Sequence, residues 1–274
     1  MPNLYKNLLV LVLAIVTVHL TYIGVIRPQA DIAILTARQA GQSAPRDLFV
    51  ILKDLEQEIC LILMIWGTFL ISDMCVYILK KRYLFSVDLL GSSTAVQSKL
   101  ETLPEELENL SELGSSAVVK SDLENSLEEL ENLPEKIKES PLVQTLMASL
   151  RRYLITGDVQ NTSDAITASI EALSVRLEAG NSMVRYLIWA IPSIGFIGTV
   201  RGIGQALSQA DKALAGDIAG MTDSLGVAFN STFVALVISI GLMFLLHQLQ
   251  RLQDGLLVDT QEYCEKFLLN RISS

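Results

Sequence analysis

Four long apolar stretches interrupt an otherwise mixed chain, and each is long enough to cross a lipid bilayer as a helix. They occupy residues 8–26, 59–79, 186–207 and roughly 225–246. A helix needs about 20 mainly apolar residues to span the hydrocarbon core, so the pattern predicts four transmembrane helices. The first stretch lacks a small-residue cleavage site and runs directly into Arg27 and Pro28, which favours a retained span over a signal peptide.

The interval between the second and third spans begins with an acidic, leucine-rich sequence. EELENL occurs at residues 105–110 and again at 128–133, with leucines at helical spacing. The chain has a net charge of −9, and residues 88–139 hold thirteen acidic residues against four lysines. This segment is either a docking surface for a cytoplasmic partner or a solvated helical face, and composition favours the solvated face.

Beyond Pro141 the helical pattern continues with fewer acidic residues. A break is predicted at Gly157–Asp158, followed by a helix start capped by Ser163 or Asp164. That helix is expected to run into the third span, with an interruption near Gly180–Asn181. The tail after the fourth span is predicted to form an amphipathic helix with these residues on one side: Leu252, Leu256, Tyr263 and Phe267.

Basic residues beside the spans predict the orientation of the chain. Lys80, Lys81 and Arg82 directly follow the second span, and Arg185 and Arg251 flank the same ends of the third and fourth. Loops rich in Lys and Arg stay in the cytoplasm. Both termini and the long acidic segment are therefore expected on the cytoplasmic side of the membrane.

These patterns together predict an all-α integral membrane protein with four transmembrane helices and long cytoplasmic helical extensions. The expected segments are residues 1–27 (first transmembrane helix), 28–57 (periplasmic loop and helix), 58–80 (second transmembrane helix), 81–184 (cytoplasmic helical domain, acidic over 88–139), 185–250 (third and fourth transmembrane helices) and 251–274 (cytoplasmic amphipathic tail).

The sequence contains no pattern typical of a catalytic or metal site. Half of the residues are hydrophobic, as in membrane proteins, and the three cysteines lack the spacing of a zinc site or a disulfide framework. Neither histidine lies beside a nucleophile motif or a Walker-type glycine loop. We therefore expect no enzyme activity, no cofactor, no bound metal and no nucleic-acid partner.

The third and fourth spans each carry a stripe of small residues. On a helical wheel one face of the third span, about 100° wide, holds Gly195, Gly198, Thr199, Gly202 and Ala206. A matching face of the fourth span holds Ala228, Thr232, Ala235 and Ser239. Small residues permit close backbone approach between helices in lipid, which makes both stripes helix-packing surfaces. Pro192 permits a kink in the third span.

The same residues resemble a known family. PSIGFIGTVRGI in the third span is similar to the P-x-x-G-x-x-G-T-V-x-G-I pattern of the MotA/TolQ/ExbB proton-channel subunits of ion-driven motors. SLGVAFNSTFVALVISI in the fourth is similar to that family's A-L-x-x-T-A-x-G-L-x-x-A-I. The similarity covers roughly residues 183–250; outside it, only the layout of spans resembles the flagellar-stator branch.

The resemblance implies a channel subunit that works with a partner. It implies a homopentamer around the paired single spans of a membrane protein whose aspartate takes up the ion. Thr199 and Thr232 would line the ion pathway between the pentamer and these helices. The flow of H⁺ or Na⁺ down the membrane potential would then drive rotary work across the cell envelope, with the ion as cargo; the threonines are compatible with either ion.

Three positions depart from the family pattern. Arg201 replaces an apolar residue and lies off the small face, where it is expected to reach the outer interface or to pair with Asp211 or Asp223. Val227 stands where the TolQ/ExbB branch has glutamate, so a proton route through that side chain is absent. Ile240–Gly241 replaces isoleucine-proline, which predicts a straighter fourth span.

Acidic residues near the spans are further candidates. Asp73 is the one carboxylate inside an apolar span, and it is expected at the interface or paired with an inner basic residue, in preference to an ion-carrying role. Asp54, Glu56 and Glu58 precede the second span. Their oxygens suit a hard cation such as calcium, but an exposed acidic helix start is the preferred interpretation.

Two other functions fit parts of the pattern. A non-conducting membrane scaffold would recruit a cytoplasmic partner through the acidic segment and would use the small stripes only for oligomerisation. A secondary transporter would show related repeats of spans, and the first two spans do not resemble the last two. The scaffold is therefore the main alternative to the channel subunit.

Overall fold

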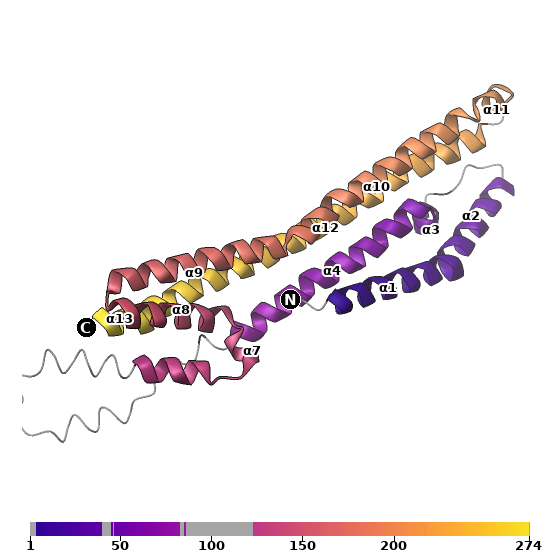
Figure 1. The fold of residues 1–274 in the computed structure, drawn as a ribbon. Coiled ribbons are helices and arrows are strands. Elements are labelled where there is room, and N and C mark those ends of the chain that lie inside the picture. Colours follow the sequence, from indigo (N-terminus) through magenta and orange to yellow (C-terminus); the bar gives the residue numbers. More distant parts are fainter. Residues whose placement is uncertain are drawn as a thin grey trace, which may run out of the picture. The chain divides into compact units, whose positions relative to one another are not determined.

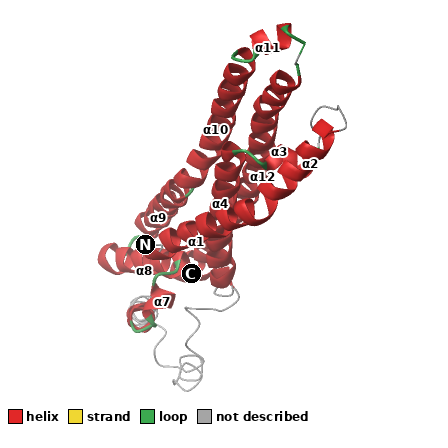
Figure 2. Cartoon of the chain, turned by 90° about the vertical axis from the view of Figure 1, so that its right-hand side faces the viewer, coloured by secondary structure: helices red, strands yellow, loops and turns green. Residues whose placement is uncertain are grey.

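The computed structural model describes residues 4–39, 45, 47–82, 85, 123–216 and 218–273. All regular secondary structure within these residues is helical, and none of it is strand (Figure 2). Four helices are long and apolar enough to cross a membrane, which confirms the predicted all-α, four-span class. The acidic stretch 88–122, with the first EELENL, lies outside the described residues.

The chain divides into two compact units, and the boundary between them falls within two of the long helices. The first unit comprises residues 1–74 and 181–249, and the second comprises 75–180 and 250–274. The first unit contains most of the apolar sequence of the predicted spans. The second contains the described part of the acidic segment and the tail.

The first predicted span contains a wide π-helical turn. Helix α1 (Leu4–Thr21) leads into η1 (Tyr22–Ile26) and then into α2 (Arg27–Gln39). Buried residues recur along it at intervals of four: Ala14, Val18, Tyr22, Ile26 and Ala30. A π turn holds more residues than an α turn. It therefore keeps this four-residue repeat on one side, where a regular helix would drift around its axis.

The remaining spans are α4 (Leu55–Lys81), α10 (Ser182–Leu207) and α12 (Ala219–Cys264). The short helix α3 (Leu48–Leu52) precedes α4, and α11 (Ala210–Leu214) lies between α10 and α12. Figure 1 shows α10 running alongside α12. Pro192 lies inside α10, which continues through it without interruption. The turn at Asn181, between α9 (Val159–Gly180) and α10, is the interruption expected before the third span.

The helices of the second unit begin and end at strong local signals. Helix α8 (Pro141–Thr156) has Ser140 as its N-cap, whose hydroxyl accepts from Val143 N at 3.4 Å, and ends at Gly157 with φ 64°. The break predicted there is confirmed. The predicted cap at Ser163 or Asp164 is wrong, because α9 begins earlier and Asp158 accepts from Gln160 N at 2.9 Å. Asp158 thus satisfies one of the first free amides of α9, directly after the glycine turn.

A hydrophobic core joins α8 to the acidic segment and the tail within the second unit. Fully buried leucines include Leu130 of the second EELENL repeat and Leu146 of α8. Glu128 and Glu129 are exposed. The described repeat thus has the leucine-in, glutamate-out pattern of a solvated helical face. The tail contributes through the end of α12, η3 (Glu265–Leu269) and α13 (Asn270–Ser273), with Tyr263 and Phe267 packed in the core as its pattern predicted.

Leu146→Ala should loosen the second unit. The side chain has no exposed surface, and truncating such a leucine costs about 2–5 kcal/mol. Hydrogen–deuterium exchange of the α8 amides should become clearly faster. Gln144→Ala is the matched control, because Gln144 is exposed on the same helix. Equal exchange in the two variants would contradict this core assignment.

Candidate functional site

Three glycines of α10, Gly195, Gly198 and Gly202, are buried against α12 of the same chain. A Cβ atom on Gly195 would lie 2.5 Å from Ala235 Cβ, and one on Gly198 would lie 2.5 Å from Ser231 Cβ. A Cβ on Gly202 would lie 2.7 Å from the backbone nitrogen of Ala228. Real Cβ atoms do not approach other atoms so closely, so the two backbones meet at a distance that only glycine permits on this face.

The two threonines meet inside this interface. The hydroxyls of Thr199 and Thr232 are hydrogen-bonded to each other, and both side chains are partly buried. Thr199 Oγ1 also donates to Ala228 O at 3.1 Å, and Thr232 Oγ1 donates to Gly195 O at 3.1 Å. A hydroxyl has one hydrogen to donate, so each threonine makes one of its possible donor contacts at a time. Every one of the contacts named here links α10 to α12. The result is a small cluster of hydroxyl and carbonyl oxygens between the helices.

Serines extend this polar seam on either side of the threonines. Ser239 Oγ donates to Ile188 O at 2.9 Å, which ties the far end of the seam across the two helices. Ser231 is almost fully buried, and it accepts from Gln57 Nε2 of α4 at 3.4 Å. Neither Gln57 nor Ser231 was identified from the sequence. The available signal was a glutamine close to the start of an apolar run, because an amide side chain that is buried there needs a hydrogen-bond partner.

Arg201 binds α4, not the acidic residues near its own helix. Its Nη2 donates to Glu56 Oε2 at 2.7 Å and lies 4.0 Å from Asp54 Oδ1. The sequence predicted that Arg201 reaches the outer interface or pairs with Asp211 or Asp223, but the structure pairs it with Glu56. Gly198 makes the contact sterically feasible, because its missing side chain leaves room for Glu56, whose Cγ would lie 3.1 Å from a Cβ there.

The acidic start of α4 is not the exposed surface that the sequence suggested. Glu56 and Glu58 are 6% and 3% exposed. Burial raises the pKa of the Asp54 carboxyl, while Lys53 and Arg201 act to lower it. Among the described residues no group of three His, Cys, Asp or Glu side chains is placed to hold a metal ion. The carboxylates of Glu56 and Glu58 instead bind basic side chains, since buried charges need partners.

Glu58 is held by two basic residues of the first span. Arg27 Nη2 donates to Glu58 Oε2 at 2.8 Å, and His19 Nδ1 lies 2.6 Å from Oε1. In a regular α-helix residues eight positions apart would point about 80° apart. The extra residue of the π turn η1 removes that offset, so both side chains reach one carboxylate. Asp73, the one carboxylate inside an apolar span, is paired with Lys6 of α1.

The arrangement has a definite chemical capacity. Hydroxyl and carbonyl oxygens can coordinate a cation or relay a proton by hydrogen bonds, but neither group takes up a proton at neutral pH. Val227, at the expected glutamate position, adds no carboxylate, and its carbonyl accepts from Ser231 at 2.9 Å. The threonine cluster therefore contains no group of its own that takes up a proton at neutral pH.

Part of the chain matches a known protein family. Residues 137–262 match the model of the MotA/TolQ/ExbB proton channel family. Neither the curated proteins nor the solved structures gave a match. The matched region contains α8 to α11 and most of α12, including Thr199 and Thr232, and it confirms the resemblance inferred from the sequence.

Proposed function

We propose that this chain is the channel subunit of an ion-driven motor, because its residues 137–262 match the MotA/TolQ/ExbB proton channel family. It is a multi-pass membrane protein with four apolar helices. In the proposal it conducts H⁺ or Na⁺ down the membrane potential and converts that flow into rotary work across the cell envelope. A single-span partner supplies the aspartate that takes up the ion.

The threonine pair is the observation that carries the proposal. Thr199 and Thr232 lie within the matched region and form a polar cluster at a seam lined by the small residues of α10 and α12. Valine has the same branched shape as threonine, so the two hydroxyl groups, and not the shape of the side chains, are what a function must explain. Two hydroxyls beside backbone carbonyls are useful to an ion that must shed its hydration next to a partner's carboxylate.

The proposed assembly is five copies of this chain around two partner helices. The large exposed apolar side chains of α10 and α12 include Trp189, Phe196, Phe229, Phe233 and Phe244. They fit lipid or neighbouring subunits.

The basic block at residues 80–82 supports an inner-membrane protein with both termini in the cytoplasm. Each charge crossing 100 mV then supplies about 2.3 kcal/mol.

The double variant Thr199→Val, Thr232→Val should assemble with its partner yet lose ion flux. Both hydroxyls disappear while the branched shape remains, so the pathway is altered more than the packing. Flux would be measured in liposomes that hold the complete complex under an imposed potential. It should fall to the level of a complex whose partner lacks the aspartate.

Thr199→Ser, Thr232→Ser is the matched control, because it retains both hydroxyls and removes only methyl groups. It should keep most of the flux. Wild-type flux in a correctly assembled valine variant would refute the ion-pathway assignment. That result would favour the non-conducting scaffold, in which a partner docks on the acidic segment, where Glu128 is exposed.

A further inference from the structure

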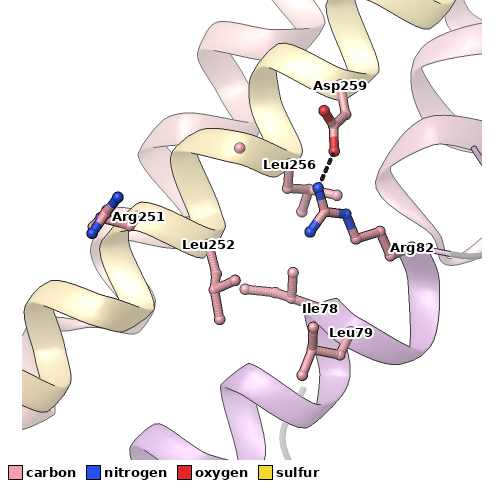
Figure 3. Close-up of a pocket in the computed structure, with 8 residues that line it drawn as sticks. Ile78, Leu79, Arg82, Arg251, Leu252, Leu256 and Asp259 are labelled. Atoms are coloured by element: carbon pink, nitrogen blue, oxygen red, sulfur yellow. Dashed lines mark ion pairs between the residues drawn. The ribbon is translucent and has the colours of Figure 1, made fainter.

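A small groove lies between the end of α4 and the part of α12 that follows the expected fourth span (Figure 3). Both walls belong to the second unit. Its volume is about 90 Å³, and its lining combines apolar and basic side chains: Ile78, Leu79, Arg82, Arg251, Leu252, Gly255, Leu256 and Asp259. None of these residues takes part in the threonine seam.

The groove has an apolar floor and a charged rim. Ile78, Leu252 and Leu256 extend into the space between the two helices (Figure 3). Arg82 reaches from α4 toward α12, where its Nη2 lies 3.4 Å from Asp259 Oδ2. Arg251 lies at the opposite side of the groove. With two guanidinium groups and one carboxylate, the rim has a net charge of about +1, which matches the single negative charge of a phosphodiester.

The position of the groove along α4 points to the same ligand. The candidate span of this helix covers Leu55–Lys81, so Ile78, Leu79 and Arg82 lie where an apolar helix surface gives way to charge. At such a depth acyl chains meet phosphate head groups. Lys80 is also exposed there and adds to the positive charge. Basic pockets at the ends of transmembrane helices bind acidic lipid head groups.

We propose that this groove binds one acidic phospholipid. Its phosphate lies against Arg82 and Arg251, and the first part of an acyl chain packs on Ile78, Leu252 and Leu256. Asp259 holds the Arg82 side chain across the groove and limits the site to a singly charged head group. The lipid would join the ends of α4 and α12, two helices that also run through the predicted membrane region. This site does not depend on ion conduction.

The experiment titrates the full-length protein in detergent with phosphatidylglycerol and with phosphatidylethanolamine, and counts bound lipid by native mass spectrometry. Wild-type protein should bind phosphatidylglycerol more tightly. Arg82→Gln, Arg251→Gln should lower that apparent affinity about 30-fold, as expected for the loss of two charge contacts. Arg152→Gln, Arg176→Gln removes the same charge from exposed sites outside the groove, and it should bind as the wild type does.

A second variant tests the groove without changing its charge. A Cβ on Gly255 meets nothing within 4 Å, so Gly255→Leu can fold while its side chain fills the space. It should abolish selective phosphatidylglycerol binding. The proposal is overturned if either groove variant binds phosphatidylglycerol as the wild type does, or if the wild type binds both lipids equally. It is also overturned if the control double variant loses affinity to the same extent.

Discussion

Gly202→Leu is expected to prevent α10 and α12 from packing and to abolish the folded protein. A Cβ at this position would lie 2.7 Å from the Ala228 backbone nitrogen and 2.8 Å from its Cα. Backbone atoms in a helix cannot rotate away as a flexible side chain can. The cost should therefore reach or exceed the upper end of the roughly 1–3 kcal/mol typical of overpacked sites. It should also separate Thr199 from Thr232, which lie across the same interface.

Gly204→Leu provides the control for this variant. Gly204 lies two residues further along α10, and a Cβ there meets nothing within 4 Å. Both substitutions add the same side chain and the same gain in helix propensity. Yield and thermal unfolding in detergent should collapse for Gly202→Leu and stay near wild type for Gly204→Leu. Similar melting temperatures for the two variants would show that α10 and α12 do not pack through this face.

Arg201→Leu should destabilise the protein more than Glu56→Gln does. Without the arginine, the Glu56 carboxylate, whose side chain is 8% exposed, stays buried with no opposite charge, and Asp54 is close by. Breaking a buried ion pair in this way costs about 3–5 kcal/mol, and the 40% exposure of the Arg201 side chain places the effect at or below the lower end. In Glu56→Gln the arginine keeps access to solvent and to Asp54, so the loss should be about 1 kcal/mol.

The double variant Arg201→Leu, Glu56→Leu separates the ion pair from the packing around it. Replacing both partners by apolar groups removes the uncompensated charge, so the double variant should melt at a higher temperature than Arg201→Leu alone. Melting temperatures of all three variants in the same detergent measure this. A double variant that is less stable than Arg201→Leu would show that Glu56 contributes through packing and not through charge.

Features that depend on local sequence were predictable. The number and type of the spans follow from the length and composition of four apolar runs, because a bilayer imposes one length on any helix that crosses it. The break at Gly157 follows from a residue that adopts positive φ at little cost. The spacing of Gly195, Gly198 and Gly202 placed them on one face, since a helix has a fixed period.

The sequence spacing showed that small residues share one face of the third span, but it could not show which helix packs against that face. That α12 of the same chain covers the glycines, and that Thr199 lies against Thr232 thirty-three residues away, depends on how the two helices pair. The helix start at Val159 was missed for a different reason. Asp158, Ser163 and Asp164 are all good capping residues, and the turn at Gly157 decided which of them is used.

The charged contacts were decided only by the tertiary structure. Arg201 and Glu56 are 145 residues apart, and the nearer acids Asp211 and Asp223 seemed better partners from the sequence. His19 and Arg27 both reach the Glu58 carboxylate because of the π turn between them, and no sequence pattern predicted that turn. The sequence by itself determined which segments are helical and apolar, because those properties are local sums over neighbouring residues. The tertiary structure decided which charges are buried together, because an ion pair depends on distances between helices that distant parts of the chain bring together.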